Sequence, residues 1–178
     1  MEEKAKLIQK KIEEKDHVER LHVEGVRQLV QEFLLREKQF KTEDLQVTPQ
    51  FKLMLSNGET TVTMDLIINL NSVSLMVIKC AYAAIESWER YTIAFARVIK
   101  DYQIPYAMIT DGKNIKIIDV INRSVLGESF TGLFTRQDAL KITEDFKKIP
   151  YPADKIEREK RIIYAFEGIK CPISKEKA

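Results

Sequence analysis

Residues 74–112 read SLMVIKCAYAAIESWERYTIAFARVIKDYQIPYAMITDG, and this stretch decides the fold. Residues 74–80 are apolar on both faces, which is typical of a strand covered on both sides. Apolar side chains then recur at helical spacing through residues 84–101. After Pro105 a second apolar run, residues 106–110, predicts another buried strand. A strand, a helix and a strand in this order form a right-handed crossover, so the two strands should be parallel.

The sequence on either side adds strands to this unit. Apolar residues alternate with polar ones over 51–55, and Asn57-Gly58 supplies the positive backbone angles of a tight hairpin turn. The alternation resumes over 62–70 and predicts the returning strand. Asp111-Gly112 is a second turn signal, and residues 115–119 alternate beyond it. With a helix before the hairpin the order is α-β-β-β-α-β-β, which predicts an α/β fold with a mixed central sheet flanked by helices.

The two ends of the chain differ from this core. Residues 1–16 alternate Lys and Glu with few apolar positions, which predicts a charged helical lead-in that is solvated or frayed. We therefore expect a core domain over 17–125 and a C-terminal helical extension over 126–178. Helices outside the crossover are expected over 17–37, 136–147 and 156–169.

Composition narrows the functional classes. Of the 178 residues 44% are hydrophobic and 31% charged, which suits a packed core and argues against a disordered chain. With 29 basic and 27 acidic residues the net charge is +2, which disfavours tight nucleic-acid binding by bulk charge. The two cysteines, Cys80 and Cys171, form no CxxC motif, so we expect no structural zinc. Because no apolar run is long enough for a membrane span and no secretory leader is visible, we expect a soluble, cytoplasmic protein.

Two charged residues stand out in apolar surroundings. Asp65 lies between Met64 and Leu66, where an unpaired buried carboxylate would be costly. It is either an exposed or salt-bridged strand residue, or a metal ligand. Lys79 ends an apolar run, where its ammonium either snorkels from the strand end or points into a site shared with Asp65.

With these residues noted, the chain resembles the PD-(D/E)xK nuclease superfamily, and more narrowly the N-terminal domain of type I restriction enzyme R subunits. The resemblance rests on short stretches in a fixed order, which are 23–30, 64–66, 76–79, 89–97, 102–112 and 159–167. It implies a restriction-endonuclease-like core and Mg²⁺- or Mn²⁺-dependent hydrolysis of DNA. In that chemistry acids hold the metal, and a lysine orients the attacking water or stabilises the developing charge. Asp65 matches the first acid, Lys79 the lysine, and Glu24 an acid that family members often place beside the metal.

The sequence departs from this family pattern at the second acid. That acid should lie two residues before the lysine, where this chain has Val77. In some members the acid moves to the following helix, where Glu86 and Glu89 are the candidates. Glu86 is also spaced for an ordinary surface pair with Arg90, so Glu89 is the better candidate.

The resemblance therefore implies a catalytic set of Asp65, Lys79, Glu89 and Glu24, with Asp65 and Glu89 as the metal ligands. Two functions stay open. The first is an Mg-dependent DNA endonuclease related to restriction–modification. The second is a catalytically degenerate nuclease fold that binds DNA or protein within a larger assembly.

Further residues bear on partners. Arg97 is either a bidentate phosphate contact or part of a structural ion pair, and Gln103 either caps a helix or lines the site, so both are candidate DNA contacts. The charged residues 157–161, with an apolar stripe beyond them, predict a C-terminal helix that docks on the core or on a partner, including a second copy. Because the chain is near neutral, DNA binding by this chain alone should be weak.

Overall fold

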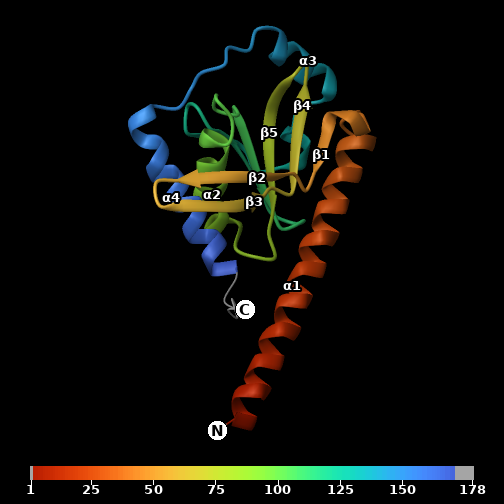
Figure 1. The fold of residues 1–178 in the computed structure, drawn as a ribbon. Coiled ribbons are helices and arrows are strands. Elements are labelled where there is room, and N and C mark those ends of the chain that lie inside the picture. The colour runs from red at the N-terminus through yellow and green to blue at the C-terminus, as the bar shows by residue number, and fades with distance from the viewer. Residues whose placement is uncertain (1, 171–178) are drawn as a thin grey trace.

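The structure is a computed structural model that describes residues 2–170. At its centre is a six-stranded mixed sheet in the order β1-β4-β5-β6-β7-β8, accompanied by a two-stranded hairpin of β2 and β3 (Figure 1). The strands of the large sheet are β1 (Leu45–Val47), β4 (Leu66–Leu70), β5 (Val73–Cys80), β6 (Tyr106–Thr110), β7 (Ile115–Asp119) and β8 (Ser124–Gly127). The hairpin strands are β2 (Gln50–Leu55) and β3 (Gly58–Thr63). The α-helices of the described residues are α1 (Glu2–Arg36), α2 (Ile85–Val98), α3 (Arg136–Glu144) and α4 (Ala153–Lys170).

The predicted crossover forms the middle of the large sheet. Every residue of β5 is buried, as expected for a strand covered on both faces. β5 and β6 pair in parallel, with Lys79 beside Ile109, and α2 connects them. The other pairings in this sheet are antiparallel. The prediction of a mixed sheet flanked by helices is therefore confirmed.

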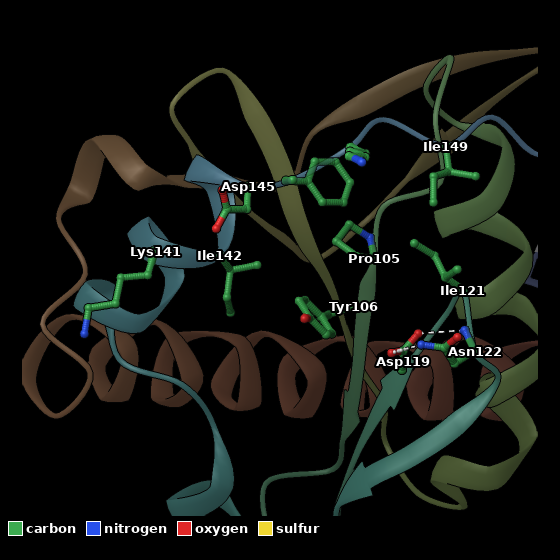
Figure 2. A pocket seen from close by; sticks show the side chains of 11 residues that line it. Pro105, Tyr106, Asp119, Ile121, Asn122, Lys141, Ile142, Asp145 and Ile149 are labelled. Carbon is green, nitrogen blue, oxygen red and sulfur yellow. Dashed lines mark hydrogen bonds between the residues drawn. The ribbon is translucent and has the colours of Figure 1, made fainter.

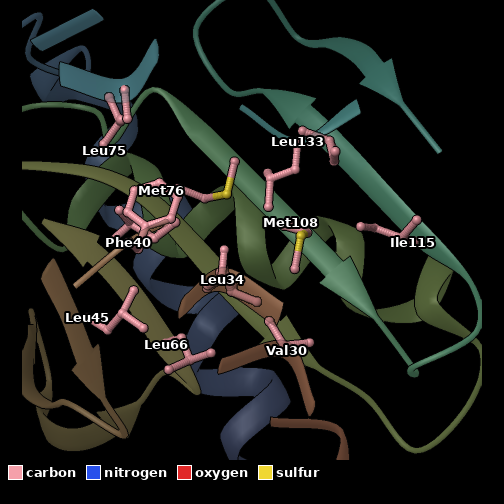
Figure 3. Packing of buried hydrophobic residues seen from close by; sticks show 14 of the residues in the cluster. Val30, Leu34, Phe40, Leu45, Leu66, Leu75, Met76, Met108, Ile115 and Leu133 are labelled. Atoms are coloured by element: carbon pink, nitrogen blue, oxygen red, sulfur yellow. The ribbon is translucent and has the colours of Figure 1, made fainter. Parts of the chain in front are cut away.

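One face of the sheet packs against α1 and α3. Val30 and Leu34 of α1 lie against Leu66, Met76 and Met108 of the central strands (Figure 3). These five side chains are fully buried. The N-terminal half of α1 extends away from the rest of the domain (Figure 1), which explains why its surface is largely exposed.

The other face packs against α2 and α4, with the β2–β3 hairpin on the same side. Tyr91 and Phe95 of α2 and Ile163 of α4 are fully buried in this layer. Phe51 of the hairpin makes an edge-to-face contact with Phe95, the ring centroids being 5.6 Å apart. The predicted C-terminal helix therefore docks on the core of its own chain.

Residues 62–70 do not form the single strand that their alternation predicts. The chain leaves β3 after Thr63, crosses to the large sheet at Met64-Asp65, and begins β4 at Leu66. Backbone hydrogen bonds from Met64 N to the Pro49 carbonyl (3.2 Å) and from Thr48 N to the Asp65 carbonyl (2.9 Å) hold the crossing. Because the in–out alternation continues through the crossing, the sequence pattern does not mark it. Asp65 thus lies at a junction between two sheets and not in the middle of a strand.

Other differences concern lengths and short elements. α1 is one continuous helix, so the helical lead-in predicted over 1–16 joins the helix predicted over 17–37 without a break in the described residues. β1 and β8 were not predicted, because they have three and four residues and β8 is largely exposed. Cys171 falls outside the described residues. None of the helices in residues 2–170 carries an apolar stretch of the length needed to span a bilayer.

Candidate functional site

Asp65 and Lys79 meet at the edge of the α2 face of the sheet. β4 and β5 are antiparallel with Leu66 opposite Ile78, which brings Asp65 opposite Lys79. The Lys79 Nζ donates to Asp65 Oδ2 at 2.6 Å, and the backbone N–H of Cys80 donates to the same oxygen at 2.8 Å. The side chain of Asp65 is 14% exposed and that of Lys79 is 8% exposed, so this is a largely buried ion pair. Of the two alternatives for Asp65, a salt-bridged residue or a metal ligand, the structure shows the salt bridge.

A further contact, with the ring of Trp88, fixes the position of Lys79. Its Nζ lies 5.1 Å from the centroid of the Trp88 ring, where a cation is attracted to the ring face. Trp88 belongs to the first turn of α2, directly after the strand that carries Lys79. The ammonium is therefore held between a carboxylate and an aromatic ring, which favours one position over a mobile one.

Glu24 is engaged within α1. The Arg27 guanidinium contacts both oxygens of its carboxylate, and Gln28 Nε2 donates to Oε1 at 3.0 Å. The hydrogen bond from Arg27 is the main reason why the pKa of Glu24 lies below its ordinary value. The same bond raises the pKa of Arg27, and the negative charge of Asp65 adds to that effect. Arg27 is therefore the main partner of Glu24.

Glu89 is engaged with a different strand. Its Oε2 accepts a hydrogen bond from Lys116 Nζ at 2.7 Å, and Lys116 lies on β7, two strands beyond β5 in the sheet. This hydrogen bond is the main reason why the pKa of Lys116 is raised. The three carboxylates predicted for one centre thus form three separate ion pairs, Asp65–Lys79, Glu24–Arg27 and Glu89–Lys116.

The residues present do not fit a divalent metal ion. Mg²⁺ and Mn²⁺ prefer several oxygen ligands, supplied by one or more carboxylates that converge on the ion. Within residues 2–170 no group of three His, Cys, Asp or Glu side chains is arranged to hold a metal. The one carboxylate at this centre already faces an ammonium.

The geometry also shows which position of β5 faces Asp65. Val77 pairs with Ile67 and is fully buried in the apolar layer under α2. At a rise of about 3.4 Å per residue it lies ~7 Å farther along the strand than Lys79. A second acid that coordinates the same metal ion as Asp65 would therefore have to be at position 79. The family's lysine would then fall two residues later, where this chain has Ala81.

The comparison with known families bears on this region directly. A family model described as type I restriction enzyme R protein N terminus matches residues 22–132. The chain belongs to this family. The match includes the large sheet, α2 and the Asp65–Lys79 pair, and it relates the domain to restriction–modification. No curated protein and no solved structure gives a match.

Arg97 of this restriction-R-type domain lies away from Asp65. It is buried on α2, where its Nη1 is 3.5 Å from Glu159 Oε1 and its guanidinium carbon is 5.1 Å from the centroid of the Tyr151 ring. Gln103 is also buried, and its backbone N–H donates to the Ile149 carbonyl at 2.9 Å. Arg97 therefore belongs to the α2–α4 side of the domain, whereas Gln103 is bonded through its backbone to the segment between α3 and α4.

Glu159 is a buried charged residue that sequence reasoning missed. The side chain of Arg90 donates to both of its oxygens, at 2.6 and 2.7 Å, and the Tyr151 hydroxyl donates at 3.1 Å. Burial alone would raise the pKa of Glu159, but the hydrogen bonds and charges of Arg90 and Arg97 keep it below its ordinary value. The prediction of a surface pair between Glu86 and Arg90 is wrong, because Arg90 pairs with Glu159 of α4 instead.

A wider hollow at the other end of the sheet carries less chemistry. It has a volume of about 670 Å³ and lies between the start of β6 and the end of α3 (Figure 2). Its walls are mainly apolar, with Tyr106, Ile121, Ile142 and Ile149 around it. At its edge the carboxylate of Asp119 accepts hydrogen bonds from the backbone N–H and the Nδ2 of Asn122, at 2.7 and 2.8 Å. Among the described residues, no group of three possible metal ligands lies in this hollow.

Proposed function

We propose that this domain is a catalytically degenerate PD-(D/E)xK-type domain that serves as a DNA- or protein-binding module in a restriction-related assembly. One observation carries the proposal: the ammonium of Lys79 lies 2.6 Å from the Asp65 carboxylate, at the position where a second acid would have to stand. The family relationship supports the link to restriction–modification. The alternative, an active Mg-dependent endonuclease, requires that centre to be rebuilt.

The chemistry favours the inactive form. Phosphodiester hydrolysis of this kind needs a metal ion that polarises the phosphate and lowers the pKa of a bound water. A divalent cation next to Asp65 would find one carboxylate oxygen already bonded to Lys79, and a single carboxylate holds Mg²⁺ only weakly. To recruit Glu24 or Glu89, the domain would also have to break the pairs with Arg27 or Lys116.

The proposal is tested by metal binding. We expect calorimetry to detect no Mn²⁺ binding to the wild-type domain at millimolar concentrations, and no Mg²⁺-dependent nicking of plasmid DNA. Lys79→Glu places a second carboxylate opposite Asp65, so this variant should bind Mn²⁺ and gain thermal stability with it. Lys79→Gln removes the ammonium without adding an acid and is the matched control.

Two additional variants make the test specific. Val77→Glu restores the acid two residues before the lysine, as in the family pattern, but the acid then points into the apolar layer under α2. We therefore expect destabilisation without Mn²⁺ binding. Ala81→Lys combined with Lys79→Glu restores an acid and a lysine two residues apart. Wild-type cutting of plasmid that needs Mg²⁺ and disappears in Asp65→Ala would overturn the proposal.

A further inference from the structure

A second hollow, here called the arginine hollow, lies between α2, the start of α4 and the turn after β7. Its volume is about 410 Å³. Five basic side chains from three separate parts of the chain line it, namely Arg90, Arg97, Arg123, Lys155 and Arg158. Its two acidic residues are Glu89 and Glu159. The hollow is therefore strongly biased toward positive charge in a chain that is nearly neutral as a whole.

The acids of the arginine hollow are already neutralised. Glu159 accepts two short hydrogen bonds from Arg90, and Glu89 accepts one from Lys116, which comes from β7. In the described part of the chain, no carboxylate forms an ion pair with Arg123, Lys155 or Arg158. Three cations thus face the same hollow without a counter-charge from residues 2–170.

Arg97 adds an independent observation. Its residue is only 6% exposed, and its Nε is a buried donor with no hydrogen-bond acceptor among the described residues. Its Nη1 lies 3.5 Å from Glu159, too far for a strong hydrogen bond, since Arg90 already occupies that carboxylate. Burial is the main reason why the pKa of Arg97 is lowered; Tyr151 and Glu159 act against it, and the charges of Arg123 and Arg90 add to it. A buried guanidinium in this state is incompletely compensated, which is costly in the absence of an anion.

We propose that the arginine hollow binds a phosphate group. Guanidinium groups form paired, charge-assisted hydrogen bonds to the oxygens of phosphate, and the positive end of the α4 helix dipole lies beside Lys155 and Arg158. Three uncompensated cations and a partly satisfied Arg97 suit a phosphate group better than a single carboxylate, which carries one charge. The same chemistry is offered by a free phosphate compound and by a nucleic-acid backbone.

This site is independent of the proposed loss of nuclease activity. Its cations come from α2, α4 and the β7–β8 turn, and Arg97 is the only one of the candidate catalytic and DNA-binding residues to supply one. Failure of the metal-binding test at Lys79 would leave phosphate binding untouched, and the reverse also holds.

The test measures binding of three probes to the whole chain, namely inorganic phosphate, a nucleoside monophosphate and a labelled DNA duplex. The first two are followed by calorimetry and the third by fluorescence anisotropy. The test variant is Arg123→Gln with Arg158→Gln, which leaves Glu159, Arg90 and Arg97 in place. The matched control is Arg20→Gln with Arg161→Gln, which removes the same charge from exposed places outside the hollow. Unfolding curves of both variants verify that the fold is retained.

We expect at least one probe to bind the wild type, and the test variant to weaken its binding by about tenfold or more, as for loss of hydrogen bonds to a charged group. The control should stay within about twofold at physiological salt. Binding of phosphate and the monophosphate identifies a small ligand, whereas binding of the duplex alone identifies a backbone phosphate, and both support the proposal. Absence of binding by all three probes, or an equal loss in the control, overturns it.

Discussion

The Asp65 centre and the Glu159 centre lie on the same face of the sheet, but they balance charge differently. At Asp65 one ammonium faces one carboxylate, and a backbone N–H of Cys80 adds to the same oxygen. At Glu159 one carboxylate serves two guanidinium groups, and three more cations surround the hollow beside it. The first centre is neutral and closed, whereas the second carries surplus positive charge.

The difference shows which part of the domain has charged groups available to bind a ligand. The family match ends at residue 132, so it contains Asp65 and Lys79 but neither α3 nor α4. Glu159 of α4 fastens the C-terminal helix to α2 through Arg90 and at the same time brings Lys155 and Arg158 to the arginine hollow. The C-terminal extension therefore supplies two of the five cations of the arginine hollow, and the other three lie within the family match.

The largest effect is expected at Glu159. Glu159→Gln removes the carboxylate that compensates Arg90 and buried Arg97, and leaves those guanidinium groups without a counter-charge. We expect the free energy of unfolding to fall by about 3 kcal/mol, the lower end for breaking a buried ion pair, because Arg90 is partly exposed. Urea unfolding followed by circular dichroism measures this.

Glu157→Gln is the matched control, since Glu157 lies on the same helix and its hydrogen bonds and ion pair within residues 2–170 go to Ser56 and Arg161 at the surface. It should leave the unfolding midpoint nearly unchanged. If both variants lose the same small amount of stability, Glu159 is not the fastening point of α4 and the contrast between the two centres fails.

A smaller effect is expected at Asp65 and Lys79. Asp65→Asn and Lys79→Met should each destabilise the domain, because each leaves one largely buried charge without its partner. In the double variant both charges are gone, so a coupling energy of about 2 kcal/mol should appear in the cycle. The same cycle repeated with Mn²⁺ should give the same value. A coupling energy near zero would mean that the ion pair does not form in solution.

The next-largest effect is expected on acidification, which should lower the contribution of Glu159 to the free energy of unfolding. The folded-state pKa of Glu159 lies below its ordinary value of 4.5, so its contribution is complete above that pH. The contribution is lost as the pH falls through the lowered folded-state pKa. Asp44, paired with Arg136, shifts in the same direction from 3.8 and adds to the loss.

Urea unfolding between pH 7 and pH 3 measures this, as ordinary carboxyl groups titrate in that interval. In Glu159→Gln the decline in unfolding free energy on acidification should be shallower than in the wild type. An identical pH profile in both proteins would show that Glu159 is not stabilised as a carboxylate.

The central strands were predictable because burial on both faces leaves a continuous apolar run, as in residues 74–80 and 106–110. The change from the hairpin to the large sheet at Asp65 could not be predicted, because apolar and polar residues keep alternating through residues 62–70. β8 was not predictable either, since an exposed strand of four residues has no apolar period. Local pattern thus describes burial well and sheet membership poorly.

The candidate site was predictable where its partners come from neighbouring strands. Asp65 and Lys79 stand out as charged residues beside apolar runs, and antiparallel pairing of their strands brings them together. Glu159–Arg90 joins residues 69 positions apart, and its formation depends on how α4 packs against α2. No helical period encodes that packing, so a buried carboxylate in α4 looks like part of a charged surface.

The smallest effect is expected at the pair between the two centres. Lys116→Gln releases Glu89, whose side chain is 34% exposed, and should lower the free energy of unfolding by less than about 1 kcal/mol. We expect no Mn²⁺ binding in this variant by calorimetry, because Asp65 is still paired with Lys79 and a single carboxylate holds the ion only weakly. If Lys116→Gln does bind Mn²⁺, and Asp65→Asn in the same background abolishes that binding, then Glu89 reaches Asp65 once it is free. In that case Lys116 would normally keep Glu89 away from Asp65. The difference between the two centres would then depend on whether Glu89 pairs with Lys116 or binds a metal together with Asp65.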